Sequence, residues 1–268
     1  MVKKMNSQTH KISTNKLSLG YGHNIIIEEL SVEILQGKIT SIIGSNGCGK
    51  STLLRGLARY LSPRHGQVLL NNEDIHSVNN VEKILAMLPQ SPVAPDGLTV
   101  YELVSMGRYP YRSFWGGLTS TDRKIIDQSL KMVEADDLAE RLVSSLSGGQ
   151  RQRVWIAMTL AQETEYLLLD EPATYLDWLH QIEVHDLLHK LNRDYDKTIV
   201  MVLHDLNMAS VYSDHIIGMK QGKITAQGTP KEIMTEENLK EIFGFNSRII
   251  FDDENNAPFC IPIKSGKA

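Results

Sequence analysis

The sequence predicts an α/β fold with a mostly parallel core sheet, an N-terminal antiparallel β subdomain and an inserted α-helical subdomain. A glycine-rich turn separates a β-branched apolar run at 39–43 from a stretch with helical apolar spacing. Two further apolar runs, at 166–169 and 198–203, end in polar residues, as buried parallel strands do at a ligand site. Between the turn and these runs, residues 91–118 are rich in proline, glycine and aromatic residues, and a charged helical stretch follows.

Length, composition and charge restrict the class of protein. The 268 residues suit one large domain or two small ones. A hydrophobic content of 41%, a charged content of 22% and a net charge of −4 are ordinary for a globular protein, and they give no sign of a nucleic-acid surface. No run has the length of a transmembrane helix, and the N-terminus lacks the apolar core of a signal peptide. We therefore expect a cytosolic protein that reaches a membrane only through a partner.

The glycine-rich turn fits a phosphate-binding loop. Gly44, Gly49, Lys50 and Ser51 have the spacing that such a loop requires. Glycines let backbone N–H groups point at the anion, the lysine brings charge to the β and γ phosphates, and the serine hydroxyl is suited to Mg²⁺. Because the turn lies between a strand and a helix N-terminus, a nucleotide site is favoured over an ordinary turn. The expected nucleotide contacts are Gly44, Ser45, Asn46, Gly47, Cys48, Gly49, Lys50, Ser51 and Thr52.

Cys48 lies inside this loop, and Cys260 is the second of two cysteines, too few for a disulfide framework. A small residue that fits the loop is favoured over a catalytic thiol at position 48. A helix N-terminus is expected to lower the pKa of a thiol, so a reactive Cys48 is the alternative. A thiol reagent would then block nucleotide binding, and ATP would protect.

Local patterns predict the remaining elements. Residues 12–34 read as antiparallel strands interrupted by a turn at 20–24, and residues 121–143 read as helical with Thr121 as the N-cap. Two hairpins are expected, at 216–226 and at 248–263. An aromatic group on the proline-rich loops, either a contact surface or the packing of a small subdomain, comprises Tyr109, Tyr111, Phe114 and Trp115.

Two strands end in residues suited to phosphate chemistry. Asp170 and Glu171 follow the run at 166–169, where one carboxylate can hold Mg²⁺ and its neighbour can act as general base on a water molecule. His204 follows the next run and could donate to a γ-phosphate. For the pair, an acidic pair in a solvated loop becomes the minor alternative once a phosphate loop is present. For His204, a structural histidine is the alternative.

The segment Leu146-Ser147-Gly148-Gly149-Gln150 begins another helix with two glycines, which makes a second backbone anion site. One nucleotide needs only one phosphate cradle. A second cradle therefore predicts that a second copy of the chain completes the site.

Five elements occur along the chain in this order: the phosphate loop at 44–51, Gln90, the segment at 146–150, the pair Asp170-Glu171, and His204. With these elements, the chain resembles the ATP-binding subunit of an ABC transporter over about 12–245. The resemblance implies a phosphate-loop NTPase core of the RecA-like type that binds ATP and Mg²⁺. It also implies that two copies form a homodimer with composite ATP sites. The expected partners are integral-membrane permease subunits and, indirectly, a substrate-binding protein. The chain would then be a peripheral protein on the cytoplasmic face of the cell membrane. Within one subunit, the resemblance implies that Tyr21 stacks on adenine and that Gln90 senses Mg²⁺ and relays to the permease. Between subunits, it implies that Ser147 to Gln150 cover the ATP bound to the other copy and that Asp177 lies at the dimer interface.

We expect a flexible tail at 1–11, because the first residues are polar and basic with no periodicity. The ATPase domain is expected at 12–245, with its helical subdomain at about 91–160, and a C-terminal extension with a hairpin at 246–268. Two segments, Leu103–Pro110 and Thr174–Asp177, resemble importers of ferric siderophores, haem and cobalamin, and the whole run is nearest to ferric-hydroxamate systems. Ser45 departs from the proline that the family often has.

Three functions compete. An ATP-hydrolysing subunit of a ferric-siderophore importer is favoured, with haem, cobalamin or a metal ion as alternative cargo. A soluble ABC ATPase acting on DNA or ribosomes is disfavoured because the chain has one phosphate loop and no heptad insertion. A nucleotide sensor without turnover is disfavoured because Glu171 and His204 are both present.

Overall fold

The computed structural model describes residues 11–113 and 116–264, and it divides into two compact units. One unit comprises Met1–Asn79 and Val200–Ala268, and the other comprises Asn80–Ile199. The tail expected at 1–11 lies almost entirely outside the described residues, as do Phe114 and Trp115 of the aromatic group. The limits predicted for the ATPase domain and its helical subdomain stay predictions.

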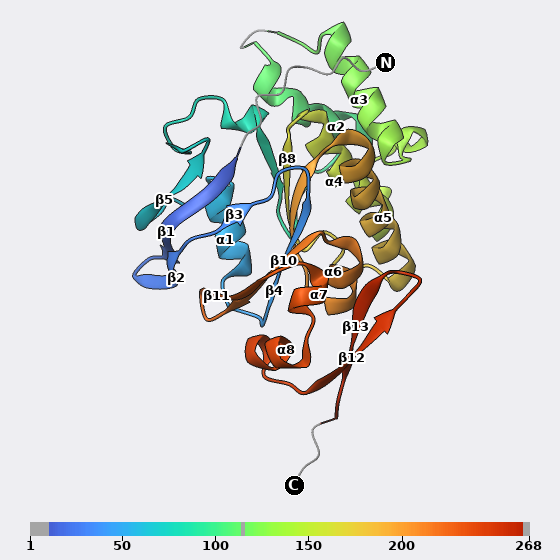
Figure 1. The fold of residues 1–268 in the computed structure, drawn as a ribbon. Coiled ribbons are helices and arrows are strands. Elements are labelled where there is room, and N and C mark those ends of the chain that lie inside the picture. The colour runs from blue at the N-terminus through green and yellow to red at the C-terminus, as the bar shows by residue number, and fades with distance from the viewer. Residues whose placement is uncertain (1–10, 114–115, 265–268) are drawn as a thin grey trace. The chain divides into compact units, whose positions relative to one another are not determined.

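An antiparallel sheet begins the first unit (Figure 1). Its strand order is β2-β1-β5-β6, and β3 pairs with the start of β1 through Ile12 and Ile34. The chain turns back after Tyr21, where β1 pairs with Asn24 of β2. The antiparallel strands predicted for 12–34 are therefore confirmed. Their bounds are β1 Ile12–Tyr21, β2 Asn24–Leu30, β3 Glu33–Ile34, β5 His65–Leu70 and β6 Glu73–Asp74.

Parallel pairing is found in the same unit, where β4 (Ile39–Gly44) runs beside β10 (His215–Lys220). All six residues of β4 are buried, as expected for a β-branched run in a parallel sheet. The predicted hairpin at 216–226 is confirmed, since β10 pairs antiparallel with β11 (Lys223–Gly228).

The helices of the first unit are short. α1 (Lys50–Leu57) buries three leucines, as its spacing predicts, but it ends before Leu61. The others are α6 Leu206–Tyr212, α7 Pro230–Ile233 and α8 Glu236–Phe243.

A C-terminal hairpin of β12 (Ser247–Asp252) and β13 (Ala257–Pro262) is held to α6. Ser210 Oγ donates to Pro258 O over 2.6 Å, and the backbone N–H of Cys260 donates to Asn207 Oδ1 over 2.8 Å.

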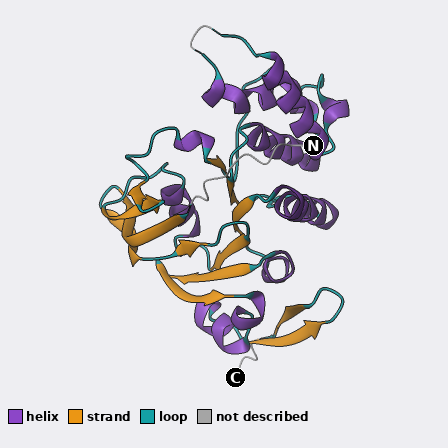
Figure 2. Cartoon of the chain, turned by 45° about the horizontal axis from the view of Figure 1, so that its top comes forward, coloured by secondary structure: helices purple, strands orange, loops and turns teal. Residues whose placement is uncertain are grey.

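The second unit is mainly helical (Figure 2), around the parallel pair of β7 and β8. The strand predicted at 166–169 is confirmed as β8 and is fully buried. The elements of this unit are η1 Val81–Lys83, β7 Leu85–Leu88, α2 Val100–Ser105, η2 Met106–Tyr111, α3 Ser120–Met132, η3 Asp136–Leu138, η4 Val143–Ser145, α4 Gly148–Ala161, β8 Tyr166–Asp170 and α5 Trp178–Tyr195. The strand predicted at 198–203 is found as β9 (Thr198–Val202), at the boundary of the two units.

The prediction that Thr121 caps the helix after the aromatic loops is wrong. Thr119 is the N-cap of α3, because its side chain accepts from Asp122 N and the Asp122 carboxylate accepts from Thr119 N. The helix also ends at Met132, where the helical interpretation of 121–143 extended too far.

In the part of the chain that the structure describes, no helix combines the length and the apolar character that crossing a membrane requires.

Candidate functional site

The turn between β4 and α1 has the conformation of a phosphate-binding loop. Gly44 has φ 151°, and a Cβ at this position would lie 2.3 Å from Met219 O, so only glycine fits. The N-cap of α1 is Gly49, which offers no side-chain oxygen to the first helical turn. The N–H groups of that turn are therefore suited to an anion.

Lys50 is 5% exposed, and its ammonium group is held against the loop. Nζ donates to Gly44 O over 2.9 Å and to Ser45 O over 3.1 Å. The turn after β10 braces the same loop, since Gly222 N donates to Cys48 O over 2.8 Å. The loop is thus preformed, and two of its backbone carbonyls hold the Lys50 ammonium group in place.

The expectation of a thiol pKa lowered by the helix N-terminus is wrong for Cys48. Its side chain is buried, and burial raises the pKa of the thiol, an effect that the nearby Lys50 charge only partly opposes. The geometry favours the small residue that fits the loop.

Two more predicted residues belong to the first unit. Tyr21 ends β1, is 45% exposed, and accepts a hydrogen bond at its hydroxyl from Arg55 Nη1 over 3.2 Å. His204 is exposed and follows β9, immediately before Asp205, which caps α6.

In the second unit, Gln90 and Glu171 are in direct contact. Gln90 Nε2 donates to Glu171 Oε2 over 2.5 Å, and Thr174 Oγ1 donates to the same oxygen over 3.0 Å. Glu171 has φ 53° and is buried, as is Asp170 at the end of β8. Thr174 was not predicted as a site residue. A hydroxyl three residues after a carboxylate in a turn is the signal that could have found it.

Ser147 begins α4 as its N-cap, which confirms the helix start predicted from the glycine pair. Gln150 N donates to Ser147 Oγ over 3.3 Å, and Ser147 N donates to Gln150 Oε1 over 3.1 Å. These two bonds form a capping box that fixes the first turn of the helix.

Asp177 caps α5, and it brings His180, a residue that sequence reasoning missed, into the same turn. His180 N donates to Asp177 Oδ1 over 3.0 Å, and the His180 ring nitrogen Nδ1 lies 2.7 Å from the same oxygen. An Asp-x-x-His spacing at a helix start is the available sequence signal.

The residues predicted to hold Mg²⁺ offer only oxygen ligands: the Ser51 hydroxyl, the Asp170 carboxylate and the Gln90 amide oxygen. Hard cations prefer such donors, so the set fits the ion chemically. Ser51 belongs to the first unit and the other two to the second.

A family model described as ABC transporter matches residues 27–174, more than half of the chain. The chain belongs to the ABC transporter family. It is 52% identical to "Probable siderophore transport system ATP-binding protein YusV" of Bacillus subtilis (strain 168), over 96% of this chain and 94% of that protein. It is 48% identical to "Iron(3+)-hydroxamate import ATP-binding protein FhuC" of the same organism, over 94% of each chain.

Solved structures confirm the predicted fold class for this ABC transporter family member. One, described as an ABC transporter of metal-chelate type in an inward-facing conformation, has a TM-score of 0.84 at 28% identity, covering 96% of this chain and 98% of that chain. A dimeric bacterial ABC transporter cassette has a TM-score of 0.71 at 30% identity, covering 81% and 98%.

Proposed function

We propose that the chain is the ATP-hydrolysing, energy-coupling subunit of an importer for ferric siderophores. The observation that carries the ATPase part of the proposal is the capped helix start at Ser147 to Gln150, a second backbone anion site in addition to the phosphate loop. The names of the siderophore and hydroxamate relatives, and the metal-chelate type of the similar structure, support the cargo.

ATP would bind to the loop of the first unit. The N–H groups of Gly44 to Thr52 and the Lys50 ammonium would hold its phosphates, and Tyr21 would stack on the adenine. Lys50 is already aimed by its bonds to Gly44 and Ser45, so little ordering remains to be done when the nucleotide binds.

For hydrolysis, Glu171 would accept a proton from the attacking water, and the products would be ADP and phosphate. Gln90 and Thr174, which both donate to one Glu171 oxygen, would orient the carboxylate. His204 would donate a hydrogen bond to the γ-phosphate. Ser51, Asp170 and Gln90 would hold Mg²⁺, which neutralises phosphate charge when bound.

A second copy of the chain would complete each ATP site with Ser147, Gly148, Gly149 and Gln150, and Asp177 would lie at the contact between the copies. The dimeric cassette among the similar structures supports this arrangement. Closure on ATP and reopening after hydrolysis would then drive integral-membrane permease subunits, and through them a substrate-binding protein. This role places the chain on the cytoplasmic face of the cell membrane as a peripheral subunit with no nucleic-acid partner.

Two variants test the proposal. Glu171→Gln should bind ATP with unchanged affinity and lose steady-state hydrolysis, whereas Lys50→Ala should lose ATP binding itself, because its charge acts before chemistry. Normal hydrolysis in Glu171→Gln would remove that residue from its assigned role. Co-purified permease subunits, reconstituted in vesicles, should import a ferric siderophore rather than haem, cobalamin or a free metal ion.

A further inference from the structure

His180 lies directly against the second glycine of the Ser147–Gln150 segment. A Cβ at Gly149 would stand 2.3 Å from His180 Cδ2 and 2.9 Å from its Cγ, closer than packed atoms tolerate. A Cβ at Gly148 would stand 3.3 Å from Leu176 Cδ2, a tight contact that only a small shift of that side chain relieves. Within this unit, the glycine pair therefore has a packing role, because it admits side chains from the start of α5 and the residues before it.

The ring of His180 is also fixed on its other side. Its Nδ1 lies 2.7 Å from Asp177 Oδ1, and the same oxygen accepts from the His180 backbone. These bonds, the backbone one first, lower the pKa of Asp177, so its carboxylate stays charged. One imidazole thus joins the carboxylate of Asp177 to the backbone of Gly149.

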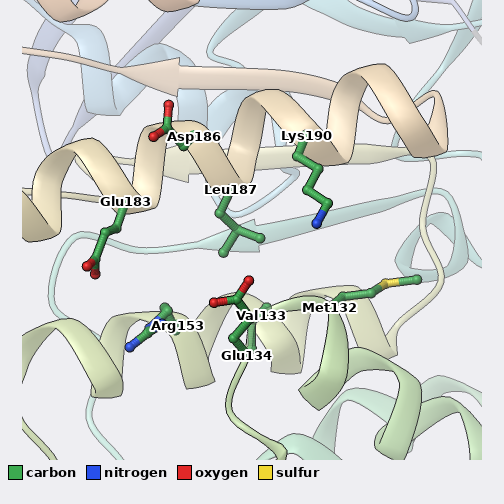
Figure 3. A pocket seen from close by; sticks show the side chains of 8 residues that line it. All are labelled: Met132, Val133, Glu134, Arg153, Glu183, Asp186, Leu187 and Lys190. Atoms are coloured by element: carbon green, nitrogen blue, oxygen red, sulfur yellow. The ribbon is translucent and has the colours of Figure 1, made fainter.

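One helical turn further along, residues of α4, α5 and the end of α3 line a pocket (Figure 3). It has a volume of about 260 Å³ and is lined by Met132, Val133, Glu134, Arg153, Glu183, Asp186, Leu187 and Lys190. Glu183 of α5 points toward Arg153 of α4, yet among the described residues no hydrogen bond or ion pair joins them, and Arg153 Nε is buried without a partner. The contact of His180 with Gly149 therefore joins the two helices at their N-terminal ends, one turn before the pocket.

We infer that His180 is a positioning residue that holds the Ser147–Gln150 turn and Asp177 together as one surface for ATP bound to a second copy of the chain. The inference rests on the proposed function, in which both segments complete the partner's site. His180 would act through Gly149 and Asp177, without touching the nucleotide. A misplacement of about 1 Å in such donors can cost on the order of a hundred-fold in rate.

The exposed side chains beside this contact suit a second copy of the chain. Tyr175, Trp178 and Leu179 are large apolar residues with exposed fractions of 83%, 70% and 64%. Such a cluster within five residues is unusual on a surface that stays in water. It is continuous with Asp177, the residue assigned to the contact between copies.

The test uses the full chain with Glu171→Gln, which should trap the ATP-bound dimer. His180→Ala is added, and two constants are measured: the affinity of the monomer for ATP, and the ATP-dependent dimerisation constant by sedimentation equilibrium. We expect unchanged ATP affinity and dimerisation weakened about ten-fold or more. His189→Ala, on the same helix α5, is the matched control and should leave both constants unchanged.

Two results for the folded His180→Ala variant would overturn the inference. His180→Ala that dimerises like its parent would show that the contact positions nothing, and an equal fall in ATP affinity would place the effect at the chain's own nucleotide. If His180→Ala does not stay folded, His180→Phe decides instead, because it fills the space but lacks the bond to Asp177, and its dimerisation should still weaken. A Glu171→Gln parent that fails to dimerise with ATP would overturn the composite site of the proposed function, and this inference with it.

Discussion

Gln90 and Glu171 meet because the strands that precede them are paired in register. Leu88 of β7 lies opposite Leu169 of β8, and the two residues that form the contact each follow by two positions. The carboxyl ends of parallel strands meet at one edge of a sheet, so the two side chains reach each other over 2.5 Å. The contact joins the residue proposed to sense Mg²⁺ to the proposed general base.

Removal of either donor to Glu171 should slow hydrolysis without weakening ATP binding. We expect Gln90→Ala to lower kcat roughly ten-fold or more, because a hydrogen bond to a charged group is lost, and Thr174→Val to do the same to a lesser degree. Because both donors share Oε2, the double variant should lose less than the product of the two single effects. Steady-state kinetics and ATP titrations of the four proteins measure this coupling.

Purely additive effects in that cycle would indicate that Gln90 and Thr174 act independently of each other and not through a shared Glu171 oxygen. Thr99→Val is a control, since Thr99 makes a comparable bond to Glu102 in a capping box at the start of α2 in the same unit. It should lower stability slightly and leave kcat unchanged.

Site residues that directly follow a buried strand could be predicted from the sequence alone. Asp170, Glu171 and His204 follow apolar runs directly, so their positions at strand ends were predictable from order alone. Thr174 and His180 could not be found in this way, because their roles depend on a turn geometry and on a side chain packed against a distant glycine. The N-cap of α3 could not be predicted for a similar reason. Thr119 and Thr121 are the same residue type, and only the fold shows that it is Thr119 whose hydroxyl donates to the Asp122 carboxylate.

Arg108 should be the most sensitive charged residue of the second unit. It is buried, donates through Nε to Asp122 Oδ1 over 2.8 Å and through Nη1 to Ala161 O over 2.7 Å, and lies over the Tyr111 ring. We expect Arg108→Met to reduce the free energy of unfolding by about 3 kcal/mol, because it leaves the buried Asp122 carboxylate without its cation. Thermal or urea unfolding measures the loss.

Two further variants test whether the loss of stability comes from the ion pair of Arg108 and Asp122. Arg112→Met removes an exposed arginine four residues away and should change stability by less than about 0.5 kcal/mol. Arg108→Met combined with Asp122→Asn should recover part of the stability, because no buried charge is then left alone. A double variant as unstable as the sum of the singles would contradict the ion-pair explanation.

Asp122 should also make the free energy of unfolding depend on pH in the acidic range. Hydrogen bonds from Thr119 first, and then from Arg108, lower the pKa of Asp122 from 3.8 to about 2. A folded pKa below the unfolded one means that the contribution is complete above pH 3.8 and is lost as the pH falls toward 2. The free energy of unfolding of Asp122→Asn should therefore fall less steeply over this window than that of the parent. Parallel curves would show that Asp122 does not bind its proton differently in the folded state.

Cys48 and Cys260 should react slowly with thiol reagents in the folded protein. Both side chains are buried, and burial raises the pKa of each thiol above its ordinary value of 9.0. The thiolate fraction in the folded state is therefore below that of free cysteine at neutral pH, and the rate should rise only at more alkaline pH. Release of thionitrobenzoate from Ellman's reagent, followed against pH for the parent, Cys48→Ser and Cys260→Ser, measures each site. Urea should make both thiols react as fast as free cysteine, and a fast reaction at Cys48 near pH 7 without urea would restore the lowered pKa that the loop's position at a helix N-terminus first suggested.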